Sequence, residues 1–187
     1  MAIRIYIDQG HNPVNPNAGA EGNGYREQDL VYTIGTLLYE RLEADSDFEA
    51  RLSRPTPTTQ IGVSNATSLR VRVEQANAWG ADLFLSLHTN ASSNSTATGV
   101  EGLVFRLGST AADIADDLVK GVVRATGLRN RGVKARPGIY VLKRTTMPAV
   151  LMELGFITNP RDAALMANSP NLFADGLYNG LRAYYGV

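Results

Sequence analysis

Asp82-Leu83-Phe84-Leu85-Ser86-Leu87-His88, residues 82–88, is an almost wholly apolar run that ends in a histidine. Its length and its bulky apolar side chains are typical of a β-strand. Helical patterns lie on either side of it in the sequence, at 68–78 and 110–126. The run is therefore predicted to be one strand of a sheet whose strands are separated by helices.

The same alternation of strand and helix extends along the whole chain. Further strands are expected at 3–8, 48–53, 100–107, 139–142 and 149–153, and further helices at 27–43 and near 170–184. Strands that alternate with helices of this length predict a mostly parallel or mixed sheet of about six strands, flanked by helices on both faces. The expected fold class is an α/β sandwich.

Some boundaries can be read from local chemistry. Thr67 and Ser68 offer a hydroxyl cap before the helix at 68–78, and Gly80 provides its stop. The polar stretches 10–26 and 89–98 are rich in Asn, Ser, Gly and Pro, which predicts long loops. Loops of that length inside a compact domain are usually functional or disordered.

Length and charge restrict the class of protein. A chain of 187 residues with 44% hydrophobic residues can build one core, so residues 1–187 are expected to form a single domain. Lys plus Arg and Asp plus Glu number 18 each, so no net charge attracts the molecule to nucleic acid or anionic lipid. No segment approaches the roughly 20 apolar residues that span a bilayer, and no signal peptide is visible. We expect neither a nucleic-acid nor a membrane partner, and recognition must be local.

The two histidines indicate a metal site. The absence of cysteine excludes thiolate ligands, so any zinc must be held by His and carboxylate. His11 follows the first expected strand and His88 ends the run quoted above. If these strands are parallel, both imidazoles lie at the edge where α/β sheets bind ligands. Glu27, which opens the first long helix, returns to that edge and completes a common catalytic zinc set.

Each candidate residue also has an ordinary structural explanation. A histidine after a strand is more often a loop or hydrogen-bonded core residue, and the helix dipole alone favours a Glu in a first turn. Glu153 ends the apolar run 149–152, where an ionised carboxylate is costly unless it is paired or functional. It is therefore either a functional group or half of an ion pair with an arginine.

Several blocks of sequence, in a fixed order, resemble a known family. They are Ile-Asp-Gln-Gly-His at 7–11, Glu27, Ser-Leu-Arg-Val-Arg-Val-Glu-Gln-Ala-Asn at 68–77, Ala-Asp-Leu-Phe-Leu-Ser-Leu-His-Thr-Asn-Ala at 81–91, Asn-Arg-Gly-Val-Lys at 130–134, Tyr-Val-Leu-Lys at 140–143 and Pro-Ala-Val-Leu-Met-Glu-Leu-Gly-Phe-Ile-Thr-Asn at 148–159. Together they resemble the zinc-dependent N-acetylmuramoyl-L-alanine amidases of the type-3 amidase family, over essentially the whole chain.

The resemblance implies that His11, Glu27 and His88 hold one Zn²⁺ and that Glu153 is the catalytic glutamate. The family hydrolyses the amide between the lactyl group of N-acetylmuramic acid and the L-alanine of the stem peptide in bacterial peptidoglycan. The expected partners are therefore the stem peptide and muramic acid. Glu153 would carry a proton from the attacking water to the leaving amine.

The chain departs from the family's pattern in the first turn. Gln9 stands where proline is usual, and Asn12-Pro13 replaces the common Gly-Gly. The resemblance therefore leaves the shape of this turn open, although His11 is retained. We further expect a monomer that acts at the bacterial cell wall, as a phage-type enzyme or an excised mature domain.

Other polar residues have two explanations each. Asp8 either holds His11 in place or is a routine turn residue. Asn90 either binds the stem peptide or forms a turn, and Glu101 is most simply a solvated or paired strand residue. Three arginines in the blocks are assigned no role: Arg54, Arg72 and Arg131.

Two other functions remain open at this point. The same metal chemistry would serve a zinc peptidase that cuts within the stem peptide. A wall-binding module without catalysis would share the blocks but has no need of three ligands and a glutamate. The sequence also leaves open whether the protein is an endolysin, a sporulation or germination enzyme, or an autolysin.

Overall fold

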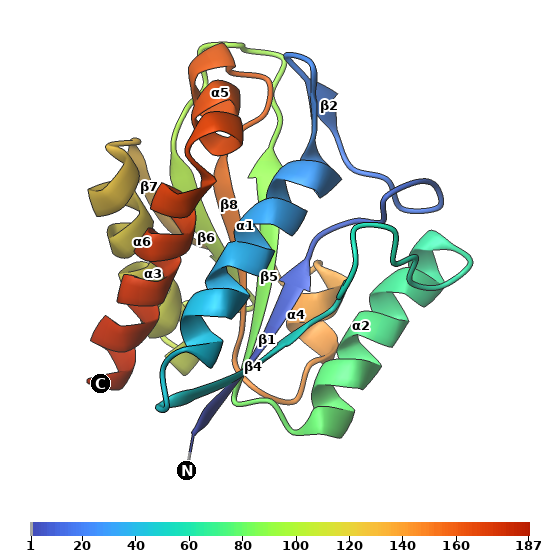
Figure 1. Ribbon diagram of the computed structural model, residues 1–187, viewed down its shortest axis with the longest axis vertical. Helices are drawn as coiled ribbons and strands as arrows, with labels where there is room; N and C mark the ends of the chain where they lie inside the picture. The colour runs from blue at the N-terminus through green and yellow to red at the C-terminus, as the bar shows by residue number, and fades with distance from the viewer. Residues whose placement is uncertain (1) are drawn as a thin grey trace.

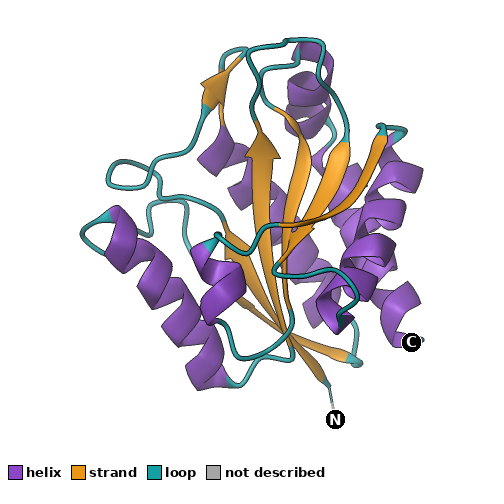
Figure 2. Ribbon diagram, turned by 180° about the vertical axis from the view of Figure 1, so that it is seen from behind, coloured by secondary structure: helices purple, strands orange, loops and turns teal. Residues whose placement is uncertain are grey.

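The alternation of strands and helices produces a central sheet with helices on both faces (Figures 1 and 2). The computed structural model describes residues 2–187. The strands of the sheet are β1 (Ile3–Gln9), β4 (Phe48–Leu52), β5 (Leu83–Asn90), β6 (Val100–Val104), β7 (Asn130–Ala135) and β8 (Ala149–Phe156). Their order across the sheet is β4-β1-β5-β8-β6-β7, and all neighbours are parallel except β6 and β8. The expected α/β class with a mixed sheet is confirmed.

Six helices flank the sheet, and a short hairpin lies outside it. The helices are α1 (Glu27–Glu43), α2 (Asn65–Trp79), α3 (Thr110–Thr126), α4 (Tyr140–Arg144), α5 (Pro160–Asn168) and α6 (Pro170–Tyr185). The hairpin pairs β2 (Glu21–Gly22) with β3 (Tyr25–Arg26), within the stretch 10–26 that was expected to be a loop.

Side-chain alternation along each strand separates two hydrophobic cores. In β5, Leu83, Leu85 and Leu87 pack in the larger core with α1, α3 and α6. Phe84 points to the other face and packs in the smaller core with residues of α2 and α4. Because both faces of the strand are covered, its sequence is almost continuously apolar. Ser86 and His88 lie on the same face as Phe84, since side chains repeat every second residue.

Several details of the expected secondary structure are wrong. The strand expected at 100–107 ends at Val104. The strand expected at 139–142 is absent: Ile139 is the N-cap of α4, and the helical turn that follows places Val141 and Leu142 together in the smaller core. The helix expected at 68–78 begins earlier, at Asn65. Ser64 is its N-cap and forms a capping box with Thr67. Gly80 ends this helix in the left-handed conformation, as expected.

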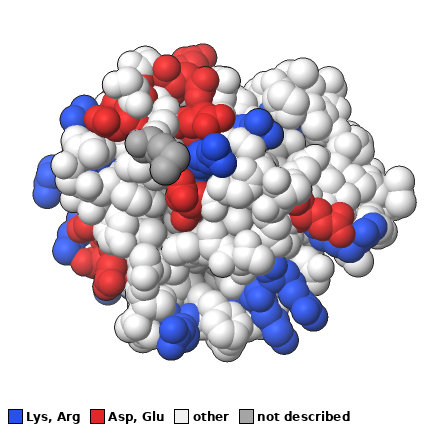
Figure 3. Space-filling model, turned by 90° about the horizontal axis from the view of Figure 1, so that it is seen from below, with Lys and Arg blue, Asp and Glu red and all other residues white. Residues whose placement is uncertain are grey.

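The face opposite to the carboxyl ends of the parallel strands carries side chains of both charges. Seen from below, acidic and basic side chains are interspersed over this face (Figure 3). Within residues 2–187, none of the helices combines the length and apolar character needed to cross a bilayer.

Candidate metal centre

The parallel pairing of β1 and β5 brings the two histidines together. Gln9 pairs with Leu87, and the N–H of Gly10 donates to the carbonyl of Leu87 at 3.0 Å. A Cβ at Gly10 would lie 2.5 Å from the His88 ring, so only glycine permits this approach. His11 itself has a φ of 64°, in the left-handed region that non-glycine residues seldom adopt. The two imidazole rings meet edge to face with centroids 4.9 Å apart.

Glu27 lies between these rings. Its Oε2 is 3.2 Å from Nε2 of His11 and its Oε1 is 3.0 Å from Nδ1 of His88. The same carboxylate accepts backbone N–H bonds from Ala20 and Thr89, each at 2.9 Å. These bonds fix the first residue of α1 against the ends of the loop and of β5. One donor atom from each of His11, Glu27 and His88 lies within 4.8 Å of the others.

The electrostatics of this cluster favour a cation. Burial alone would raise the pKa of Glu27, but hydrogen bonds from both histidines hold that pKa well below its usual range. Burial lowers the pKa of His88, yet its hydrogen bond to Glu27 and the charge of Glu27 raise it overall. Nδ1 of His11 is buried without a hydrogen-bond partner among the described residues. Two imidazoles and one carboxylate are the donors of a catalytic zinc site, so the residues fit such an ion.

Glu153 stands one strand away from the cluster. It pairs in register with His88 across β5 and β8, so the two side chains lie on the same face. Its Oε2 is enclosed and has no hydrogen-bond partner among the described residues. Burial raises the pKa of Glu153 to about 7, with further contributions from Glu27 and Glu101 against that of His88. A carboxyl group with such a pKa can both accept and donate a proton near neutrality.

Glu101 continues this row on the next strand. It pairs with Glu153 across β8 and β6, and its side chain is 6% exposed. It forms ion pairs with Arg131, at 2.8 Å, and with Lys134. The interpretation of Glu101 as a paired strand residue is therefore confirmed. Asn90 donates a long hydrogen bond of 3.3 Å to the same carboxylate.

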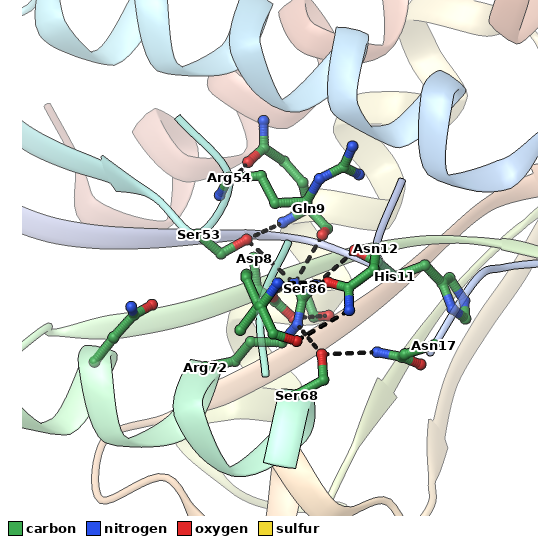
Figure 4. A network of polar contacts seen from close by, with 12 residues as sticks. Asp8, Gln9, His11, Asn12, Asn17, Ser53, Arg54, Ser68, Arg72 and Ser86 are labelled. Carbon is green, nitrogen blue, oxygen red and sulfur yellow. Dashed lines mark hydrogen bonds and ion pairs between the residues drawn. The ribbon is translucent and has the colours of Figure 1, made fainter. Parts of the chain in front are cut away.

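Asp8 does not hydrogen-bond to the ring of His11. Its buried carboxylate pairs with Arg72 and accepts a 2.7 Å hydrogen bond from the hydroxyl of Ser86 (Figure 4). Arg72 in turn donates to the carbonyls of Gln9, at 2.8 Å, and His11, at 2.5 Å. Asp8 is therefore linked to His11 only indirectly, through an arginine that binds the backbone of the turn.

The two departures from the family's pattern are buried and hydrogen-bonded. Gln9 accepts a 2.9 Å hydrogen bond from the backbone N–H of Arg54, and its Cγ fits against Gly35 of α1. Asn12 donates to the carbonyls of Pro16 and Ile61 and accepts from the N–H of Ile61. These side chains connect the turn to the loop after β4.

Sequence reasoning missed Arg72 and the Glu101 cluster as parts of the site. For Arg72, the available signal was an arginine on the face of a helix otherwise lined by Val73 and Ala76, since a buried cation needs a counter-ion. For Glu101, the signal was the alternation within β6, which places it on the face of Leu103. Arg54 also proved to be buried, with hydrogen bonds to backbone carbonyls.

The sequence and the fold match known proteins. Residues 5–183 match the family model described as N-acetylmuramoyl-L-alanine amidase. The chain is 34% identical to the N-acetylmuramoyl-L-alanine amidase CwlM of Bacillus licheniformis, over 99% of this chain and 70% of that protein. It is 33% identical to the uncharacterized protein YqiI of Bacillus subtilis, over 97% of this chain and 84% of that protein. An N-acetylmuramoyl-L-alanine amidase from Clostridium difficile 630 superposes with a TM-score of 0.87 at 29% identity, over 99% and 97% of the two chains.

Proposed function

Because this chain belongs to the N-acetylmuramoyl-L-alanine amidase family, we propose that His11, Glu27 and His88 bind one catalytic Zn²⁺ and that Glu153 carries the proton. The protein is an enzyme that hydrolyses the amide between N-acetylmuramic acid and L-alanine in peptidoglycan. We propose residues 1–187 as its catalytic unit.

The chain's own residues account for most of the steps. A zinc ion held by these ligands would lower the pKa of water and polarise the scissile carbonyl. Glu153 accepts the proton of the attacking water at its unpartnered Oε2. It then returns this proton to the leaving amine nitrogen of L-alanine. The pKa of about 7 suits both transfers, because a group is most effective in general acid–base catalysis when its pKa is near the working pH.

One observation carries this proposal. The only two histidines of the chain lie with Glu27 in one cluster, and a carboxylate with a free, enclosed oxygen lies one strand away. A protein that only binds the wall needs neither of these features. We propose Asn90, the last residue of β5, whose side chain donates to Glu101 on β6, as a further contact for the stem peptide.

Digestion of purified peptidoglycan tests the function. Zinc-loaded protein is expected to release intact stem peptides with a free L-alanine amine, detected by mass spectrometry. Zinc-loaded Glu153→Gln should lose about 10²- to 10⁴-fold in rate while it keeps the metal. Cleavage between residues of the stem peptide would instead identify a peptidase. Wall binding without any hydrolysis would identify a binding module.

The place of action and the oligomeric state follow from the same proposal. The family acts on the bacterial cell wall, and we propose that this chain does so as a monomer. Light scattering coupled to gel filtration should give a mass near 20.2 kDa. A dimer mass at working concentration would contradict this.

A further inference from the structure

The face of the sheet that carries the metal cluster extends past Glu153. His88, Glu153 and Glu101 pair in register across β5, β8 and β6, so the three side chains share one face. On β7, Lys134 pairs with Leu103, which lies on this same face. The helix that packs against β6 and β7 is α3, which covers the opposite face. The row of charged side chains thus continues from the catalytic carboxylate to the edge of the sheet.

This end of the row carries more positive than negative charge. Arg131 and Lys134 share the single carboxylate of Glu101. Asp162 lies near this end of the sheet, but its carboxylate accepts hydrogen bonds from Thr98 and from the N–H groups of Gly99 and Phe156. It forms no ion pair among the described residues. Arg131 and Lys134 therefore have one carboxylate between them as an ion-pair partner within the described residues.

Both cations are held in place, and each has N–H donors without an acceptor among the described residues. Arg131 is 26% exposed and Lys134 is 34% exposed. The guanidinium of Arg131 lies over the ring of Phe156, 4.9 Å from its centroid, and Nε donates to Glu101. Within the described part of the chain, Nη2 of Arg131 has no acceptor and the ammonium of Lys134 has only Glu101. Such preorganised donors bind carboxylates well.

The sequence supports a local preference for anions. The whole chain is neutral, yet every charged residue between Asp117 and Glu153 is basic. This segment includes β7, which is the edge strand next to β6, and α4, which packs against β8. The basic residues of this segment that lie on β7 therefore occupy the edge of the sheet beyond Glu101.

We propose that Arg131 and Lys134 form a subsite for a carboxylate of the stem peptide. This inference rests on the proposed function, because it places the scissile amide beside Glu153. The residue after L-alanine is a γ-linked glutamate with a free α-carboxylate, or its α-amide. With the amide at Glu153, this group lies one residue from the reacting centre, and the proposed subsite places it toward β6 and β7, where the two cations lie. The subsite distinguishes the acid from the amide.

Matched substrates test the subsite. Muramyl tripeptides with γ-D-glutamate or with its α-amide at the second position are compared for kcat/KM. The wild-type enzyme should prefer the acid by about tenfold, the usual effect of one charge-assisted hydrogen bond at a partly exposed site. Lys134→Met should lose this preference because its kcat/KM falls only for the acid substrate, and Lys134→Arg should restore the preference. Arg136→Met is the control, because Arg136 is an exposed cation just after β7 whose side chain contacts only the carbonyl of Ala135.

Binding of the released peptide gives a readout that does not depend on turnover. Calorimetry with L-Ala-γ-D-Glu-L-Lys and with its α-amide should show tighter binding of the acid by wild type, and equal binding by Lys134→Met. Equal binding of the two peptides by wild type would overturn the subsite. An equal loss of kcat/KM by Lys134→Met on both substrates would also overturn it, because the cations would then act on Glu153 only through Glu101. Failure of the wild-type enzyme to release any free L-alanine amine would instead refute the proposed function, and the binding comparison would still decide the subsite.

Discussion

Glu153 is a carboxyl group whose surroundings disfavour its charge. Burial raises its pKa from 4.5 to about 7 in the folded protein. Because the pKa of Glu153 is higher in the folded than in the unfolded protein, its carboxyl contributes to the free energy of unfolding in full below about pH 4.5. This contribution is lost as the pH rises through about 7. Glutamine, which carries no charge, avoids this loss. The ionised Glu153 side chain therefore lowers the free energy of unfolding, a cost that its proposed catalytic role would explain.

We predict that the metal-free Glu153→Gln variant gains stability over metal-free wild type as the pH rises from about 5 to about 8. The expected gain is about 2 to 3 kcal/mol, from the size of the pKa shift. Urea unfolding in the presence of a chelator at several pH values measures it. Glu40→Gln, at an exposed position of α1, serves as the control and should show no such trend. A difference that does not vary with pH would show that Glu153 ionises normally.

Arg72 links a buried ion pair to the backbone of His11, a proposed metal ligand. It neutralises Asp8 and donates to the carbonyls of Gln9 and His11. His11 is in the left-handed region, which costs of order 1 kcal/mol for a non-glycine residue and persists only where its surroundings impose it. The arginine therefore holds a strained turn in the shape that aims His11 at Glu27.

We expect Arg72→Lys to weaken zinc binding by about tenfold or more, because an ammonium cannot donate to two carbonyls and Asp8 in the same planar geometry. Competition with a chelator gives the affinity. Val122→Ala, a core truncation in α3, controls for general destabilisation and should leave the affinity close to that of wild type. If both variants bind zinc like wild type, the network only stabilises the fold.

The helices α3 and α6 approach each other closely because glycines line their contact. A Cβ on Gly121 would lie 2.2 Å from the carbonyl oxygen of Gly176, and one on Gly180 would lie 2.8 Å from the backbone of α3. These are backbone atoms, which cannot move aside as the end of a side chain can. The packing of the larger core over β6 thus depends on these residues rather than on apolar area alone.

Gly121→Ala is expected to destabilise the protein by about 1 to 3 kcal/mol, the usual cost of overpacking, despite the higher helix propensity of alanine. Gly138→Ala is the matched control, since nothing lies within 4 Å of its added Cβ and its φ is not positive. Thermal unfolding compares the two. A stabilised Gly121→Ala protein would show that the helices can separate at little cost.

At the scale of elements, the sequence predicts the long amphipathic helices well and the short or irregular elements poorly. The helices at 27–43 and 110–126 agree with α1 and α3 at both ends, because an amphipathic period continues over several turns. The apolar run at 139–142 predicts a strand, and the structure has a helix, because four apolar residues fit either structure. β7 was missed because its residues, Asn-Arg-Gly-Val-Lys-Ala, do not alternate, and α5 was missed although Asn159 and Pro160 form a regular helix start.

At the scale of the molecule, the candidate site could be predicted in part because parallel strands end at one edge. His11, Glu27 and His88 lie together, and Glu153 lies one strand away, because β1, β5 and β8 are adjacent and parallel. Strand order is not encoded locally, so the position of Glu101 beside Glu153 could not be read from spacing. Neither could the Asp8–Arg72 pair, whose members are 64 residues apart.

The same edge couples metal binding to the stability of the whole domain. Glu27 begins α1, His11 follows β1 and His88 lies in β5, so an ion bound by all three would join three elements that are separate in the sequence. In the unfolded chain these ligands are separated, so zinc binds the folded state preferentially and stabilises it by mass action.

We therefore predict that zinc raises the melting temperature of wild type. At a free zinc concentration about 1,000 times the dissociation constant, the stabilisation is about 4 kcal/mol. For a domain of this size, that corresponds to a rise of about 8 to 16 °C. Scanning fluorimetry of chelator-treated protein, with and without zinc, measures the shift. His88→Ala should abolish it, because two remaining ligands hold zinc poorly, whereas Glu153→Gln should retain it in full, because a proton carrier is not a ligand. Loss of the shift in Glu153→Gln would move that carboxylate into the ligand set, and a full shift in His88→Ala would mean that zinc binds elsewhere in the protein.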